Sequence, residues 1–170
     1  MNETIIEIIE IAVESKLTLN EKKLTRLLNK NFTLVKDSAE EKGEDLADIL
    51  FNIAPFCKEI DAVMHGLKHS VLYKNAAELL HLMFTKLSID ISKEECFIWF
   101  HFRGLGKFRT KEEKAFNELK SEWGLHKEYA MDFADFEVAM RELKNHGIIN
   151  LRRGAITLPD SCVFRFNYKA

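Results

Sequence analysis

Proline, glycine and cysteine are all scarce in this chain of 170 residues, which has two prolines, seven glycines and three cysteines. A β-sandwich or barrel needs many turns, and turns use proline and glycine, so the scarcity favours helices. The cysteines, Cys57, Cys96 and Cys162, are odd in number, lie far apart and include no Cys-x-x-Cys pair. That usage is typical of a reducing compartment and argues against a disulfide framework.

Long apolar runs and a strong charge of one sign are also missing. No apolar stretch approaches the ~20 residues that span a bilayer, and glutamates interrupt the apolar N-terminus, so neither a membrane span nor a signal peptide is predicted. We therefore expect a cytoplasmic protein. Residues 1–92 carry 11 basic and 15 acidic side chains (net −4), and residues 93–170 carry 14 and 12 (net +2). Any surface that faces a polyanion is therefore expected in the C-terminal part.

Helical spacing of apolar residues predicts a helical bundle over residues 1–90. We expect a loop over 36–44, which contains Gly43, and a cap at Thr18 or Asn20 at the start of the second helix. Pro55 is expected in the first turn of the fourth helix. The predicted helices cover residues 3–15, 18–32, 45–54, 56–69 and 71–88.

The first helix has an unusually wide apolar side. Its glutamates, Glu3, Glu7, Glu10 and Glu14, form one polar stripe at steps of four, three and four residues, and almost everything between them is apolar. Such a helix is either wedged between neighbours in its own chain or shared with another subunit. The second alternative predicts a homodimer.

Capping signals divide the C-terminal part into short helices. Ser92 and Glu95 form one predicted capping box, Thr110 and Glu113 a second, and Asp132 is a third candidate cap. The aromatic run 97–102 suits a strand as well as a helix, and the capping box before it favours a helix. Gly147 ends the last helix.

After Gly147 the apolar period changes from 3.6 to 2. The change predicts a strand over 148–152, a turn at Arg153-Gly154 and a return strand over 155–158. Residues 162–166 are a further candidate strand.

The segment from Ala139 to Leu158 resembles the third helix and wing of winged helix-turn-helix proteins. In that family a leucine near the end of the helix precedes a glycine and two apolar residues that enter the wing, and here these are Leu143, Gly147, Ile148 and Ile149. The resemblance covers about 93–166. Together with the helical spacing of residues 1–90, it predicts a mainly α fold, with an N-terminal helical bundle (1–90) packed on a C-terminal winged-helix-like unit (92–170) that carries a small β-hairpin.

Many members of this family bind DNA with the third helix in the major groove and the wing on the backbone. By this resemblance the expected backbone contacts are Arg152, Arg153, Arg109 and Lys107, and the expected base contacts are Arg141 and Asn145. Arg109 and Lys107 belong to a basic stretch, 103–111, that contains no acid. Against this reading, residues 133–146 carry three acids and two bases. Neutralising phosphates supplies most of the affinity, so an acidic groove helix is unfavourable.

Other functions are weighed on the same residues. A protein-binding module, such as an immunity or antitoxin-like protein, is the main alternative, because the acidic N-terminal half suits a basic partner. Asp61, His65 and His69 share one helix face and are a weak candidate metal site, and Gly66 disfavours the helix that the site needs. No catalytic or cofactor-binding motif is present, so we predict a non-catalytic binding protein without a cofactor.

Overall fold

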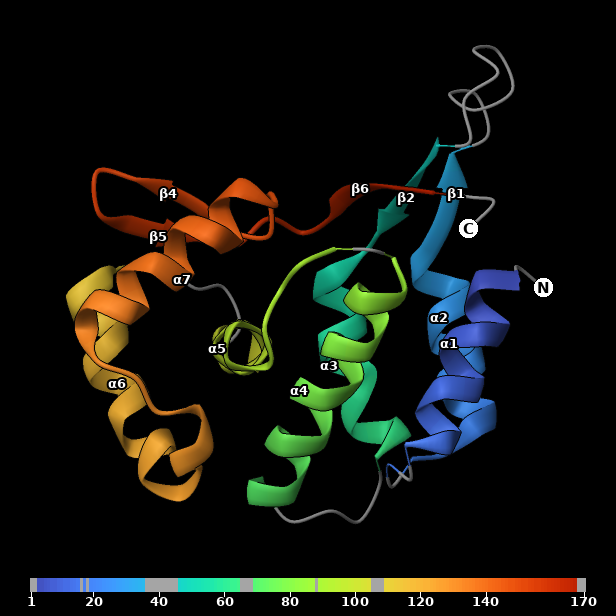
Figure 1. Ribbon diagram of the computed structural model, residues 1–170, viewed down its shortest axis with the longest axis horizontal. Coiled ribbons are helices and arrows are strands. Elements are labelled where there is room, and N and C mark those ends of the chain that lie inside the picture. The colour runs from blue at the N-terminus through green and yellow to red at the C-terminus, as the bar shows by residue number, and fades with distance from the viewer. Residues whose placement is uncertain are drawn as a thin grey trace. The chain divides into compact units, whose positions relative to one another are not determined.

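The computed structural model describes residues 3–15, 17, 19–35, 46–64, 69–87, 89–104 and 109–167 (Figure 1). The fold is mainly helical with two small antiparallel sheets. Within the described residues, no helix has both the length and the apolar character to cross a membrane. The helices are α1 (Glu3–Glu14), α2 (Glu21–Asn31), α3 (Ile53–Val63), α4 (His69–Lys86), α5 (Lys93–Gly104), α6 (Glu112–Leu125) and α7 (Phe133–Asn145). The strands are β1 (Phe32–Val35), β2 (Leu46–Phe51), β3 (Arg109–Lys111), β4 (Asn150–Arg152), β5 (Ala155–Thr157) and β6 (Cys162–Asn167).

The chain divides into two compact units. The first consists of residues 1–66, 82–90 and 160–170, and the second of residues 67–81 and 91–159. The first unit contains α1, α2, α3 and the sheet β1-β2-β6. The second contains α5, α6, α7 and the sheet β3-β5-β4.

The helix predicted over 45–54 is wrong, because residues 46–51 form strand β2. β2 is the central strand of its sheet and pairs antiparallel with β1 on one edge and β6 on the other. A short segment of mostly apolar residues suits a helix and a buried strand equally well, and here the pairing of both edges makes it a strand. At the end of β2, Phe51 stacks on Phe32 with 4.4 Å between ring centroids and meets the edge of Phe56.

Strand β6 confirms the strand expected over 162–166. Its partner is β2, in register from Leu46↔Asn167 to Phe51↔Cys162, so it belongs to the first unit and not to the hairpin that precedes it. The pairing joins segments more than a hundred residues apart, which a local pattern in the sequence does not reveal.

Three of the predicted helix starts are confirmed in atomic detail. Asn20 accepts a hydrogen bond from the backbone N–H of Lys23 at 3.0 Å. Ser92 and Glu95 form the reciprocal capping box, with bonds of 3.1 and 3.3 Å, and α5 follows as a helix. Asp132 caps α7. The box predicted at Thr110 is wrong, because Thr110 lies in β3 and α6 begins two residues later at Glu112, with Lys111 at the N-cap position and no side-chain cap.

Helix α1 packs within its own chain. The side chains of Ile5, Ile8, Ile9 and Ala12 are at most 6% exposed. Most of the apolar face on which the prediction of a homodimer rested is therefore buried within the chain, and Val13 at its edge is 47% exposed.

Helix α5 is the centre of the second unit. Its residues Cys96, Phe97, Ile98 and Trp99 are all fully buried. Phe97 stacks on Tyr129 with the ring centroids 4.8 Å apart. The aromatic run therefore forms core and offers no exposed rings for stacking on bases.

Candidate nucleic-acid interface

Helix α7 is held firmly at both ends. At its start the carboxylate of Asp132 accepts a hydrogen bond from the N–H of Asp135 at 2.8 Å. At its end Gly147 has φ +73°, and the N–H groups of Gly147 and Ile148 donate to the carbonyls of Lys144 and Leu143. This pair of bonds is a Schellman motif, which requires the left-handed conformation that glycine adopts without strain.

The buried side of α7 fixes which residues face outward. Phe136, Ala139, Met140 and Leu143 are at most 4% exposed. The opposite face consists of four exposed residues at steps of four, three and four, which places them in one line along the helix. We call this line the α7 stripe: Ala134, Val138, Arg141 and Asn145.

The α7 stripe contains no carboxylate. By helical geometry Asp135 and Glu142 lie on one flank of the stripe, and Glu137 lies on the other. A surface that docks on the stripe therefore meets one cation and three uncharged side chains. The negative net charge of the whole helix therefore does not describe the charge of the α7 stripe.

Arg141 also acts on a carboxyl group at the start of α6. Burial and the neighbouring Glu137 raise the pKa of Glu112, and Arg141 partly opposes that rise. The guanidinium of Arg141 is exposed and is therefore still open to a partner.

The sheet of the second unit gathers cations on its outer face. β5 is the central strand, with β3 on one edge and β4 on the other. Residues paired across a sheet point to the same side. Lys111, Ala155 and Arg152 therefore form one row, and Arg109, Thr157 and Asn150 form the next row on the same face.

The inner face of this sheet is closed by the core. Ile156 is fully buried, and it pairs with Thr110 and Leu151 on its two sides. The outer face is exposed at both edges, where Arg109, Lys111 and Arg152 stand on either side of the small residues of β5. With the turn residue Arg153 these cations form what we call the wing cluster: Arg109, Lys111, Arg152 and Arg153. None of the four forms an ion pair with a carboxylate in the described part of the chain.

The hairpin turn has a strained residue at its tip. Arg153 has φ +51° and Gly154 has φ +72°, the combination of a two-residue type I′ turn. Among the described residues, Arg153 is the only one other than glycine with positive φ. The carbonyl of Gly154 accepts a hydrogen bond of 3.0 Å from the N–H of Glu112, which ties the turn to the start of α6.

Replacing Arg153 by asparagine is expected to stabilise the fold and to weaken polyanion binding. Asn-Gly is the favoured pair in type I′ turns, and left-handed backbone costs an ordinary residue about 1–2 kcal/mol. We expect Arg153→Asn to raise the free energy of unfolding by about 0.5–1 kcal/mol in urea melts. Retention on heparin should fall because one cation is lost. A stability that stays unchanged or falls would show that the turn is not strained.

The predicted site residues fall into three groups. Arg152, Arg153 and Arg109 lie together in the wing cluster, and Arg141 and Asn145 lie together on the α7 stripe. Lys107 lies outside the described residues. Ala134 and Val138 were missed, although their spacing from Arg141 was a usable signal. Lys111 was noticed only as part of the basic stretch, because its place in one row with Arg152, on the other side of Ala155, depends on the register of a strand that was not predicted.

Two further groups, the candidate metal ligands and the thiol of Cys96, add nothing to this site. The side chains of the metal candidates Asp61, His65 and His69 lie outside the described part of the structure. Among the side chains that are described, no three His, Cys, Asp or Glu residues converge on a metal-sized site. Burial raises the pKa of the Cys96 thiol well above its usual range, so the thiol stays protonated and packs as an apolar group.

Comparisons of the chain with protein-family models, curated proteins and solved structures found no match.

Proposed function

We propose that the second unit is a winged-helix nucleic-acid-binding domain and that the protein acts as a non-catalytic, transcription-regulator-like protein. In this proposal the α7 stripe faces base edges in the major groove, and the wing cluster contacts the phosphate backbone. Arg141 and Asn145 are the residues suited to hydrogen bonds with guanine and adenine, and Val138 is suited to a thymine methyl group.

The order of the elements supports the proposal. From residue 91 on, the second unit has the order α5, β3, α6, α7, β4, β5, and its strands pair in the order β3-β5-β4. A helix, a short strand, a helix pair and a closing hairpin are the elements of a winged helix. The fold by itself does not select a ligand, because winged helices also serve in protein contacts.

The wing cluster is the main evidence that the ligand is a nucleic acid. Its four cations are exposed at one sheet face and its turn, without carboxylate partners among the described residues. Structural arginines and lysines on a surface are usually interspersed with acids, whereas phosphate-binding surfaces concentrate cations. The carboxylate-free α7 stripe weakens the objection that the net charge of the helix raised, because the three acids lie on its flanks and not on the line that would face the bases.

Salt dependence of binding to duplex DNA tests the proposal. If all four cations of the wing cluster contact phosphates, the slope of log K against log [salt] is about −3.6, and affinity falls on the order of a hundredfold between about 50 and 200 mM salt. Fluorescence anisotropy with a labelled duplex measures both quantities. No binding at about 50 mM salt, together with co-purification of a protein partner in salt-resistant stoichiometry, would favour the protein-binding alternative.

A further inference from the structure

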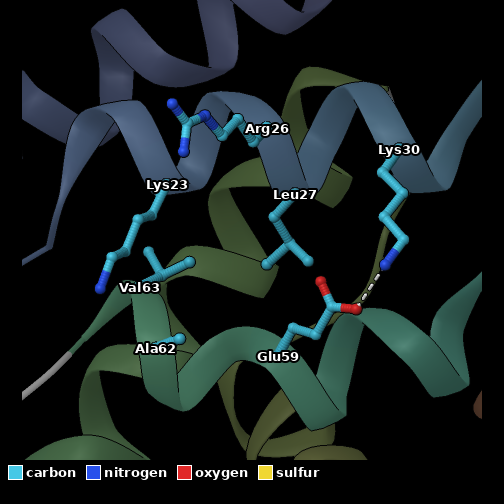
Figure 2. A pocket seen from close by; sticks show the side chains of 7 residues that line it. All are labelled: Lys23, Arg26, Leu27, Lys30, Glu59, Ala62 and Val63. Carbon is cyan, nitrogen blue, oxygen red and sulfur yellow. Dashed lines mark hydrogen bonds and ion pairs between the residues drawn. The ribbon is translucent and has the colours of Figure 1, made fainter.

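A groove runs between α2 and α3 in the first unit (Figure 2). Its volume is about 220 Å³, and its floor is formed by Leu27 and Val63, which are 3% and 2% exposed. The remaining lining residues are Lys23, Arg26, Lys30, Glu59 and Ala62. The groove therefore combines an apolar floor with a wall of three cations and one carboxylate.

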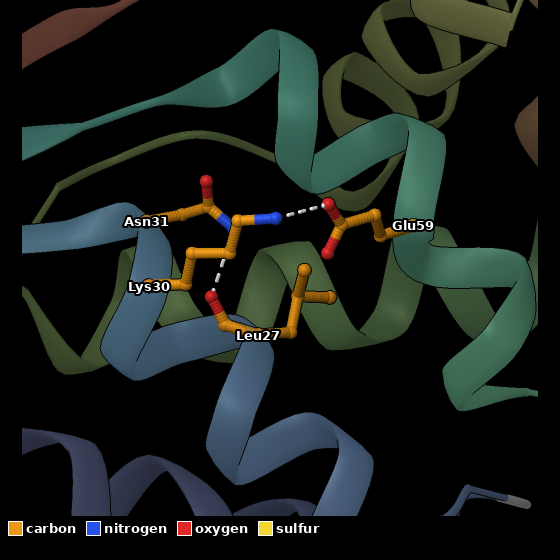
Figure 3. Close-up of polar contacts among 4 residues, drawn as sticks. All are labelled: Leu27, Lys30, Asn31 and Glu59. Carbon is orange, nitrogen blue, oxygen red and sulfur yellow. Dashed lines mark hydrogen bonds and ion pairs between the residues drawn. The ribbon is translucent and has the colours of Figure 1, made fainter.

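The two ends of the groove differ in charge. At one end the ammonium group of Lys30 donates to Oε1 of Glu59 at 2.7 Å, beside the Asn31 amide that bonds back to the carbonyl of Leu27 (Figure 3). At the other end Lys23 and Arg26 project without an ion pair to any carboxylate in the described ranges (Figure 2). The seven-residue step from Lys23 to Lys30 separates the ends by ~10 Å. An anionic group therefore fits the Lys23 end, away from Glu59.

The size and chemistry of the groove restrict the kinds of group that can bind in it. Sites for whole cofactors occupy about 300–1,000 Å³, and a cavity of about 150 Å³ already holds a benzene molecule. A groove of about 220 Å³ thus accepts one or two apolar side chains. A phosphate backbone would gain nothing from Leu27 and Val63 and would be repelled by Glu59. The matching occupant is a helix edge with one apolar side chain flanked by carboxylates.

Helix α1 of this chain carries such an edge. Val13 is 47% exposed, and Glu10 and Glu14 are exposed beside it on the same side of the helix. Neither of these glutamates forms an ion pair with a described residue, whereas Glu7 on the same stripe pairs with Lys86. Glu10 and Glu14 are ~6 Å apart along the helix axis, and Lys23 and Arg26 are ~4.5 Å apart, so the two pairs can face each other.

We propose that the α2–α3 groove binds the Glu10–Val13–Glu14 edge of α1 from a second copy of this chain. Val13 enters the apolar floor, and the two glutamates face Lys23 and Arg26. If each copy offers both its edge and its groove to the other, the contact closes as a twofold dimer. The contact is small, so the association is weak and sensitive to salt. This inference concerns the first unit and does not depend on the proposed function of the second.

A charge-swap experiment in the 170-residue chain tests the inference. Sedimentation equilibrium from about 10 µM to about 1 mM protein covers the range expected for a small interface. At low salt the wild-type mass should rise with concentration toward that of a dimer. Lys23→Glu with Arg26→Glu should weaken association at least tenfold, and Glu10→Lys with Glu14→Lys should do the same. The quadruple variant should recover wild-type association to within about threefold, because every charge pair is re-formed with its signs exchanged.

Controls separate this contact from general effects of charge and of misfolding. Lys74→Glu with Lys93→Glu changes the net charge equally at exposed positions in the second unit and should leave association unchanged. Val13→Ser should weaken association without any change of charge. Thermal melting identifies variants that are folded. A wild-type protein that stays monomeric throughout the concentration range would overturn the inference, as would a folded quadruple variant that fails to recover.

Discussion

Reversing both arginines at the wing tip, Arg152→Glu with Arg153→Glu, is expected to lower affinity for duplex DNA on the order of a hundredfold at about 50 mM salt. Two cations that contact phosphates are lost, and two carboxylates that repel phosphates replace them. The slope of log K against log [salt] should fall in magnitude from about 3.6 to about 1.8 or less. Both side chains are exposed and unpaired with described carboxylates, so the fold should tolerate the change.

A matched variant distinguishes a local contact from an effect of net charge. Lys74→Glu with Lys93→Glu introduces the same change of charge at exposed positions on α4 and α5, two helices that contribute no residue to the wing cluster or to the α7 stripe. It should reduce affinity by no more than a few fold through long-range electrostatics. Equal losses in the two variants would mean that the wing makes no specific contact with the backbone.

Truncating Phe136 is expected to cost the second unit about 3–5 kcal/mol of stability. Phe136 is fully buried on α7, and its ring lies 5.5 Å from that of Phe116 and 6.4 Å from that of Trp123, both on α6. Phe136→Ala leaves a cavity where the two helices meet and removes aromatic contacts in addition to buried area. Because this cluster holds α7 against α6, DNA binding should be lost together with the cooperative unfolding transition.

The outward face of the same helix provides the control. Val138 lies on the α7 stripe and is 46% exposed, so Val138→Ala should change the free energy of unfolding by no more than about 0.5 kcal/mol. Chemical denaturation followed by tryptophan fluorescence measures both variants, since Trp123 lies in the affected cluster. A loss below 1 kcal/mol for Phe136→Ala would contradict the assignment of the aromatic cluster as the support of α7.

Features coded by a few neighbouring residues could be read from the sequence. The caps at Asn20, Ser92 and Asp132 and the stop at Gly147 each depend on side chains within four residues of the helix end. The Arg153-Gly154 turn is equally local, because both residues must adopt positive φ. These signals were enough to predict α5, α7 and the hairpin.

Features that depend on distant pairing could not be predicted. The sequence of β2 suits a helix as well as a strand, and only its pairing with β1 and β6 makes it a strand. β3 has only three residues, and its pairing with β5 places Arg109 and Lys111 on the same sheet face as Arg152, on the opposite edge and more than 40 residues away in sequence. The basic residues themselves were recognised in advance, whereas their gathering on one sheet face is a consequence of register.

The charge of α7 shows why a sum over residues can mislead. Three acids and two bases in residues 133–146 argued against contact with phosphates. The exposed line opposite Phe136 and Leu143 contains Arg141 and no acid. Interpreting the helix by its faces would have placed the three acids beside this line from sequence alone, because Phe136, Met140 and Leu143 recur at helical spacing and mark the buried face.

Amide chemical-shift mapping with duplex DNA is the most direct test of the second unit as a winged-helix nucleic-acid-binding domain. ¹H–¹⁵N spectra of the wild-type protein would be recorded during addition of a duplex of about 21 base pairs, two helical turns. We predict that the largest shifts fall on the α7 stripe and on residues 150–157, and that they shrink as salt is added. Shifts confined to the first unit, or no shifts at about 50 mM salt, would contradict the proposal.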